Sequence, residues 1–237
     1  MTSLTGKRIL VTGAGSGIGR AAARLCASLG AELFLVGRRG NTLRETLPGA
    51  EHREIDHADD GSVAAFAKEC PELDGMFLAA GQLLMGSVES TPAADFDCMI
   101  AANLRGPWLV CHHLGSRLRI GASVVLVGSN IGIRAIPDSA AYSVSKAGVH
   151  MLAQVLALEW APHGVTVNAV APTFIRTPGT AERLDEADFA ADVLARIPVG
   201  RFGTTADVAA AVHYLASPAA GLVTGTVLPV DGGWTAR

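Results

Sequence analysis

Short apolar runs of strand length alternate with helix-length stretches along almost the whole chain. Most of these runs carry little charge, which is typical of parallel strands that helices cover on both faces. The expected strands are residues 7–12, 31–37, 51–56 (the weakest), 75–80, 122–128, 165–171 and 226–230. We therefore expect an α/β fold, a doubly wound parallel sheet of seven strands in the order 3-2-1-4-5-6-7.

Composition narrows the possible functions. The 237 residues are 49% apolar and 17% charged, and the net charge of −3 gives no basic surface for nucleic acid. No window approaches the ~18 uninterrupted apolar residues of a membrane span. The first residues lack the apolar segment of a secretory signal, so we expect a cytoplasmic protein. Four cysteines without a Cys-x-x-Cys pair indicate reduced, buried thiols and no metal site: Cys26, Cys70, Cys98 and Cys111.

Two helical segments are more apolar than one sheet face requires. Residues 140–160 are apolar on nearly every side, and residues 104–118 also carry excess apolar surface. A helix that is apolar all round is buried all round, and a sheet covers only one side of it. We therefore expect a second copy of the chain to cover the other side.

A glycine-rich turn follows the first expected strand. It reads Thr12-Gly13-Ala14-Gly15-Ser16-Gly17-Ile18-Gly19, and the expected helix 17–29 begins inside it. Glycines allow a tight turn and a close approach of the backbone to a pyrophosphate, and a helix N-terminus offers free N–H groups to an anion. The strict Gly-x-Gly-x-x-Gly spacing is absent, but the position between a strand and a helix predicts a dinucleotide site. Its contacts are expected from Gly13, Ser16, Gly17, Ile18 and Gly19.

The end of the second strand indicates which dinucleotide is bound. An acidic residue there would bind the ribose 2′-hydroxyl of NAD(H). This chain has Arg38 and Arg39 instead, and two guanidinium groups suit a 2′-phosphate. We therefore predict NADP(H) in preference to NAD(H).

Four polar residues form a candidate catalytic set. Ser129 follows the fifth strand, and Tyr142 and Lys146 lie one helical turn apart at the start of the helix 140–160. An ammonium group beside a phenol favours the phenolate and so favours acid–base chemistry. Ser129 can hydrogen-bond a substrate oxygen, and Asn103, expected to start the preceding long helix, can hold a water.

These motifs together resemble the short-chain dehydrogenase/reductase family, in its shorter single-domain branch. The resemblance rests on Thr12-Gly13-x-x-x-Gly17-Ile18-Gly19, Asn103, Ser129, Tyr142-x-x-x-Lys146 and Val230-Asp231-Gly232-Gly233. It implies one Rossmann-type domain over residues 1–237 and a homotetramer built on the two apolar helices. It also implies that Tyr142 is the general acid or base and Ser129 positions the reacting oxygen. Lys146 then lowers the tyrosine pKa and binds the nicotinamide ribose, while Asn103 carries the proton-relay water.

Further cofactor contacts follow from the resemblance. Asp56 matches an acid that usually contacts the adenine, and His57 stands where the family usually has an apolar residue. We interpret His57 as a surface variant beside the cofactor and not as a proton donor. The remaining expected contacts, with Ala79 replacing the family asparagine and Thr173 the family glycine, are Ala79, Ala80, Gly81, Tyr142, Lys146, Pro172, Thr173, Ile175 and Thr177.

The substrate is the least defined feature of the sequence. We expect residues 178–198 to form a lid. The expected lining consists of Gln82, Leu83, Leu84, Met85, Asn130, Ile131, Ile133, Arg134 and Phe174. The first hypothesis is a dehydrogenase that acts on a sugar, a polyol or another small carbonyl compound. The second is a 3-oxoacyl-[acyl-carrier-protein] reductase, for which Arg117, Arg119 and His163 give only a weak basic docking patch. The third, a non-catalytic cofactor-binding regulator, conflicts with the complete catalytic set.

Overall fold

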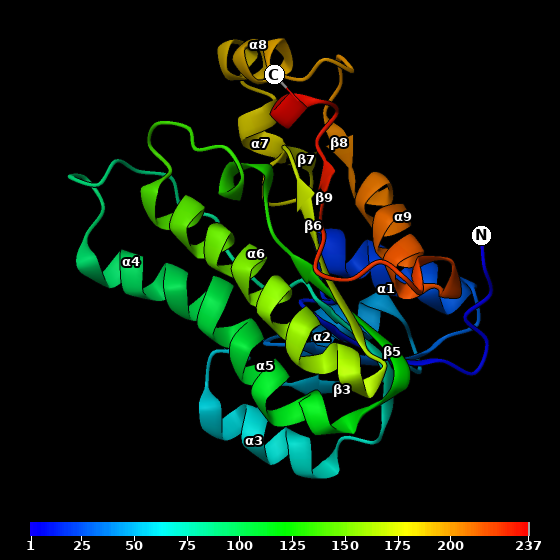
Figure 1. The fold of residues 1–237 in the computed structure, drawn as a ribbon. Helices are drawn as coiled ribbons and strands as arrows, with labels where there is room; N and C mark the ends of the chain where they lie inside the picture. Colours follow the sequence, from blue (N-terminus) through cyan, green and yellow to red (C-terminus); the bar gives the residue numbers. More distant parts are fainter. Residues whose placement is uncertain (237) are drawn as a thin grey trace.

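The computed structural model describes residues 1–236, so Arg237 at the end of the expected domain lies outside the described residues. Seven strands form one sheet in the order β3-β2-β1-β4-β5-β6-β9, and every neighbouring pair is parallel (Figure 1). This confirms the predicted fold class and strand order. The strands are β1 (Arg8–Thr12), β2 (Glu32–Gly37), β3 (Glu51–Glu54), β4 (Leu73–Leu78), β5 (Leu118–Val127), β6 (Thr166–Pro172) and β9 (Val227–Val230). The last strand has a higher number because β7 (Ile175–Arg176) and β8 (Gly203–Thr204) pair separately.

Helices cover both faces of the sheet, as the apolar strands require. Successive residues of a strand point to opposite faces, and Leu10 and Val11 of β1 accordingly belong to different core clusters. The first cluster is completed by α3 (Asp60–Glu69), α5 (Gly106–Leu114) and α6 (Ala140–Trp160). The second is completed by α1 (Gly17–Ser28), α2 (Gly40–Thr46) and α9 (Thr205–Ala216). The remaining helices are α4 (Ala93–Ile100), α7 (Ala181–Leu184) and α8 (Ala187–Ala195).

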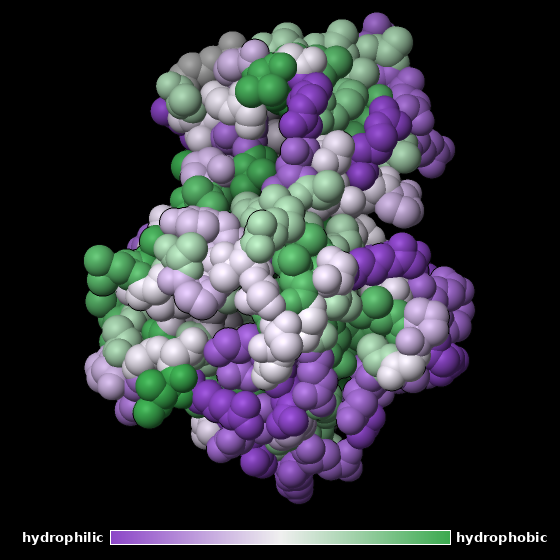
Figure 2. All heavy atoms as spheres, turned by 90° about the vertical axis from the view of Figure 1, so that its right-hand side faces the viewer, coloured by the Kyte–Doolittle hydropathy of each residue, from purple (hydrophilic) through white to green (hydrophobic). Residues whose placement is uncertain are grey.

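The part of the chain around α7 and α8 rises above the carboxyl ends of the strands (Figure 1). Viewed from the side of α1 and α9, the molecule narrows between this upper part and the main body (Figure 2). No helix within residues 1–236 combines the length and hydrophobicity that a membrane crossing requires. In a parallel sheet the ligand-binding crevice lies at the carboxyl ends of the strands. The expected cofactor and catalytic residues therefore belong at the upper end of the sheet in Figure 1.

Several predicted local features are wrong in detail. Cys98 is exposed on α4, whereas the other three cysteines are buried as expected. The strand β5 begins at Leu118, four residues earlier than its apolar run, because its polar first residues still form backbone contacts: Leu118 pairs with Leu73 of β4, and Gly121 donates to the carbonyl of Gly164.

The predicted excess of apolar surface on α6 is present in the structure: among the exposed large side chains are Val144, Met151, Val155 and Leu158.

Candidate active site

The turn after β1 requires glycine at two positions where the sequence provides it. Gly13 has φ +66°, and a Cβ there would lie 2.7 Å from the backbone nitrogen of Ala80. A Cβ on Gly19 would overlap the carbonyl oxygen of Gly13. Helix α1 can therefore start directly against the end of β1. Its N-cap residue Ser16 is exposed and makes no side-chain capping bond, so the first N–H groups of the helix keep their capacity to donate to a ligand.

A cleft of about 730 Å³ extends from this turn across the ends of β2, β3 and β4. It brings together thirteen of the predicted cofactor contacts: Gly13, Ser16, Gly17, Ile18, Gly19, Arg38, Arg39, Asp56, His57, Ala79, Ala80, Gly81 and Thr177. The glycine turn at one wall and the free helix N-terminus beside it fit a pyrophosphate group. Pro172, Thr173 and Ile175 line an adjoining pocket. This pocket shares six residues with the cleft: Ile18, Ala79, Gly81, Gln82, Leu83 and Thr177.

Arg38 and Arg39 lie at the edge of the cleft where β2 ends, and both side chains are exposed. Within residues 1–236 no carboxylate forms an ion pair with either guanidinium group. Glu32, the acid nearest in this strand, lies at its other end and pairs with Arg8 at 3.1 Å. The arrangement fits an additional phosphate on the ribose.

The adjoining pocket, of about 390 Å³, contains Ser129, Tyr142 and Lys146. The Ser129 hydroxyl and the Tyr142 phenol line this pocket together, and the Ser129 side chain lies near enough to the phenol to favour its ionised form. Lys146 Nζ donates to the carbonyl of Val127 at 2.8 Å and lies 5.8 Å from the centroid of the tyrosine ring. Burial lowers the pKa of Lys146 to about 8. Burial also raises the pKa of Tyr142, although the Ser129 side chain acts in the opposite direction.

Asn103 does not start a helix, contrary to the sequence prediction. Helical structure runs without a break from α4 into α5, and Asn103 lies in a π-helical turn at Ala101–Arg105 between them. π-helical turns of this kind are frequent at functional sites. The buried Asn103 amide donates to the carbonyl of Gln82 at 3.0 Å and accepts from its N–H at 2.8 Å. A Cβ on Gly81 would lie 2.7 Å from Asn103 Oδ1 and 3.6 Å from Lys146 Nζ, so glycine keeps these groups close.

His57 is not a surface variant. It lies on the loop between β3 and α3, and its side chain is only 11% exposed. Its Nε2 lies 2.8 Å from the carbonyl oxygen of Ala102 in the π-helical turn. The sequence could not show this because the partner is 45 residues away.

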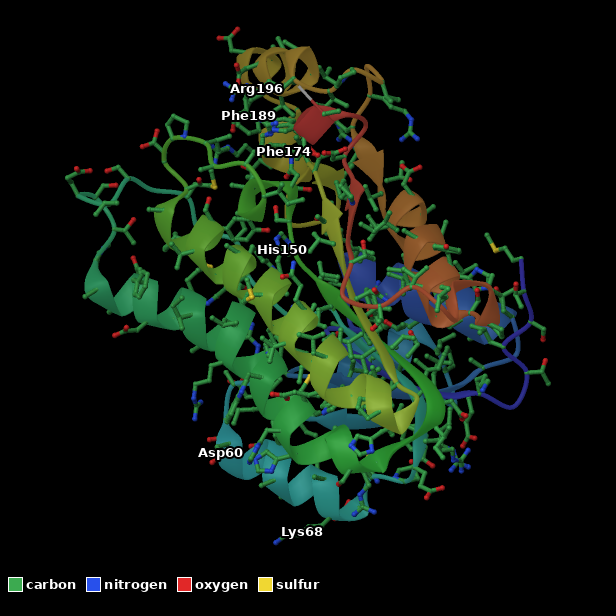
Figure 3. The ribbon with its side chains drawn as sticks, viewed as in Figure 1. Asp60, Lys68, His150, Phe174, Phe189 and Arg196 are labelled. Atoms are coloured by element: carbon green, nitrogen blue, oxygen red, sulfur yellow. The ribbon has the colours of Figure 1, made fainter. Side chains whose placement is uncertain are left out.

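His150 is a residue near the site that the sequence reasoning missed. It lies on α6, one turn beyond Lys146, and is labelled in Figure 3. The backbone N–H of Ser129 donates to its Nε2 at 3.3 Å. A Cβ on Gly128 would overlap the imidazole, and one on Gly132 would lie 2.9 Å from it. The available signal was a histidine within an apolar helix together with the Gly128-Ser-Asn-Ile-Gly132 spacing.

The expected substrate lining is divided among three places. Gln82, Leu83, Met85, Asn130, Ile131 and Phe174 line the pocket of the catalytic set. Leu84 lines the larger cleft instead, and Ile133 and Arg134 line a separate open hollow with His150. Thr180 and Gly179 also line the catalytic pocket, and the sequence reasoning had assigned them only to the lid.

Aromatic contacts hold the segment above the pocket. Phe174, which follows β6, lies 5.6 Å from Phe189 of α8 and 5.8 Å from Trp234, measured between ring centroids (Figure 3). The guanidinium group of Arg196 lies 5.8 Å from the Trp234 ring centroid. One wall of the catalytic pocket is thus packed directly against α8.

Comparisons with known proteins agree with this geometry. Residues 13–235 match the family model described as enoyl-(acyl carrier protein) reductase. The chain is 36% identical to D-threitol dehydrogenase of Mycolicibacterium smegmatis, over 99% of this chain and 95% of that protein. It is 32% identical to an NAD-dependent glycerol dehydrogenase of Listeria innocua, over 99% and 96%.

A solved structure extends the similarity to three dimensions. The protein comes from Beutenbergia cavernae, is provisionally assigned as an NAD(P)-dependent gluconate 5-dehydrogenase, and contains NADP at low occupancy. It superposes with a TM-score of 0.92 at 34% identity, over 99% of both chains. The chain therefore belongs to the short-chain dehydrogenase/reductase family of NAD(P)-dependent oxidoreductases.

Proposed function

We propose that this enzyme interconverts a secondary alcohol and a ketone by hydride transfer with NADP(H). We further propose that its substrate is a sugar, a polyol or another small carbonyl compound. The observation that carries this proposal is the placement of Ser129, Tyr142 and Lys146 in one pocket that adjoins the dinucleotide cleft. Two hydroxyl groups held together at that point can both donate to one substrate carbonyl oxygen.

In the direction of reduction, bound NADPH would supply the hydride to the carbonyl carbon. The Ser129 hydroxyl donates to the carbonyl oxygen and fixes its position. Tyr142 donates a second hydrogen bond and transfers its proton to that oxygen as negative charge develops on it. Burial raises the pKa of Tyr142, so the phenol holds its proton until negative charge develops on the substrate oxygen. The Lys146 ammonium group, 5.8 Å from the ring, stabilises the resulting phenolate.

Asn103 would hold the water that returns a proton to this pair. Its carbonyl would accept the N–H of residue 107 in a regular α-helix, but that residue is Pro107, which has no N–H. A water can take the vacant position. Pro172, Thr173, Ile175 and Thr177 would contact the nicotinamide end, because they line the catalytic pocket beside Ile18.

Arg38 and Arg39 support the preference for NADP(H), and the NADP in the Beutenbergia cavernae structure is consistent with it. The named relatives support a polyol or sugar substrate.

The alternative function, reduction of a substrate on an acyl carrier protein, has less support because the two arginines of the expected basic docking patch are already engaged. Arg119 pairs with Glu72 and Asp74, and Arg117 donates to the carbonyl of Ala67. Both arginines lie at the start of β5, at the end of that strand farthest from Ser129.

Three further expectations are part of this proposal. Residues 178–198 would act as a lid of the single domain, and the packing of Phe174 against Phe189 supports a coupling between that segment and the pocket. The exposed apolar side chains of α4, α5 and α6, which include Phe96, Trp108 and Met151, support a homotetramer. A cytoplasmic location stays a prediction.

The experiment follows the absorbance of reduced nicotinamide in both directions with NADP(H) and NAD(H). Its substrates are four- to six-carbon polyols, sugar acids, cyclic ketones and a 3-oxoacyl thioester. Turnover of a polyol or small ketone, faster with NADP(H), is the expected result. Exclusive turnover of the thioester would overturn the substrate proposal, and faster turnover with NAD(H) would overturn the cofactor preference.

A further inference from the structure

We infer that His57 is a positioning residue that supplies a hydrogen bond missing from the helical turn around Asn103. The inference rests on the proposed role of Asn103, but its structural part can be tested separately. His57 belongs to the loop after β3, whereas Asn103 lies in the helical run from α4 to α5. The contact between them is therefore a tertiary one, which joins the adenine side of the cleft to the proposed proton relay.

The first step concerns the carbonyl group of Ala102. In a regular α-helix it would accept the N–H of Gly106, but that N–H donates to the carbonyl of Ala101 in the π-helical turn. In a continued π-helical register its donor would be residue 107, and Pro107 has no N–H. The Ala102 carbonyl thus lacks both of its donors within the helix.

The second step is the replacement donor. His57 Nε2 lies 2.8 Å from this carbonyl oxygen. A carbonyl only accepts, so Nε2 carries the proton and donates. Burial lowers the pKa of His57, which favours the neutral ring with a single N–H. Asp56 Oδ1, 3.9 Å from the other ring nitrogen Nδ1, is its nearest acidic partner.

The third step is the room for the ring. A Cβ on Gly106 would overlap the carbon Cδ2 of the His57 imidazole. Glycine and proline are both unfavourable inside a helix, yet this helix has them in sequence at Gly106 and Pro107. Gly106 leaves space for the imidazole. Pro107 has no N–H, so the Ala102 carbonyl remains free to accept from the imidazole. The three residues therefore make one structural device.

The consequence falls on Asn103, which directly follows Ala102. The Asn103 amide holds both backbone polar groups of Gln82, at 3.0 and 2.8 Å, and its Nδ2 also lies 3.1 Å from Ser145 Oγ. Without His57 the Ala102 carbonyl would have no hydrogen-bond donor, which would destabilise the turn and let Asn103 move. His57 would then affect the proton relay without contact to substrate.

Four variants test this device: H57L removes the donor, H57Q keeps an N–H at the same number of bonds from Cβ, P107A restores a backbone N–H, and H57L/P107A combines both changes. We expect H57L to lower kcat about tenfold while the Kd for NADPH, measured by fluorescence titration, changes less than about threefold. H57Q should stay within about threefold of the unchanged enzyme, whereas P107A is its own reference because its new N–H also competes for the Asn103 carbonyl. Relative to P107A, the further change to H57L should lower kcat less than about threefold, a non-additive result typical of residues that share one partner.

Hydrogen exchange of residues 100–110 gives a readout that needs no substrate. H57L should exchange the Gly106 N–H at least about threefold faster, and P107A should reverse this in the double variant. The inference is overturned if H57Q behaves as H57L, or if H57L changes exchange and kcat as much in the P107A background as in the unchanged enzyme. An equal loss of kcat and NADPH affinity in H57L would also overturn it, because His57 would then act on the cofactor. If the enzyme turns over no alcohol or ketone, the proposed function fails while the exchange data still decide the role of His57.

Discussion

The backbone N–H of Ser129 donates to His150 Nε2 at 3.3 Å, so α6 fixes the loop after β5 as well as carrying Tyr142 and Lys146. Gly128 and Gly132 allow this contact, because a Cβ at either position would press on the imidazole. All three side chains proposed to act on the substrate therefore depend on one helix. His150 is nearly buried behind them and accepts this bond in its neutral form.

The variant H150Q should change how stability depends on pH. Burial lowers the pKa of His150 to about 4 from the ordinary 6.5. The unfolded chain therefore binds a proton at His150 between these values and the folded chain does not, so stability is lost as pH falls from 6.5 towards 4. Between pH 7.5 and 5 this histidine removes about 2 kcal/mol from the free energy of unfolding. Urea unfolding at both pH values should show a fall smaller by that amount in H150Q. Parallel falls in the two proteins would contradict the assignment.

The glycine turn should show a cost beyond that of the left-handed backbone conformation. G13A places a Cβ 2.7 Å from the Ala80 nitrogen at φ +66°, whereas G49A, at φ +88°, meets nothing within 4 Å. We expect about 1 kcal/mol of destabilisation in G49A and at least about 3 kcal/mol in G13A, measured by urea unfolding. G13A should also lose NADPH binding, and G49A should keep it. Equal destabilisation by the two substitutions would show that the turn relaxes away from β4.

Arg38→Asp should weaken NADPH binding by about tenfold to a hundredfold while NADH binding changes less than about threefold. The reason is that a 2′-phosphate exists only in NADPH and would meet a carboxylate in place of a guanidinium group. Arg44→Asp is the matched control, since it reverses the same charge on α2 and does not line the cleft. Fluorescence titration of both cofactors gives the two dissociation constants. Equal weakening of NADPH and NADH by Arg38→Asp would refute the proposed phosphate site.

The sequence predicted the fold closely because periodicity and turn chemistry act locally. The helix 140–160 was predicted with the bounds that α6 has, and the strand order followed from apolar runs alternating with helices. The glycine turn was also readable, because it needs only a strand, a positive φ and a helix start. Most of the expected cofactor contacts line one cleft for the same reason: parallel strands end at one edge.

Features that depend on contacts distant in sequence could not be read in this way. His57 was predicted at the surface, but its ring is buried against Ala102, which lies on another element. Asn103 was predicted at a helix start, whereas it lies in a π-helical turn inside a longer helical run. His150 carried no motif at all. In each residue a backbone hydrogen bond formed only in the folded chain decides the side chain's role.

The central claim is that Tyr142 transfers the proton in alcohol–ketone interconversion. The most direct measurement compares the unchanged enzyme with Y142F, using the best polyol or ketone from the substrate panel, for kcat and for the Kd of NADPH. We predict a fall in kcat of about 10³-fold with an NADPH Kd within about threefold, since phenylalanine keeps the ring and removes the acidic proton. Retention of more than a tenth of kcat in Y142F would contradict the account, because another group would then transfer the proton.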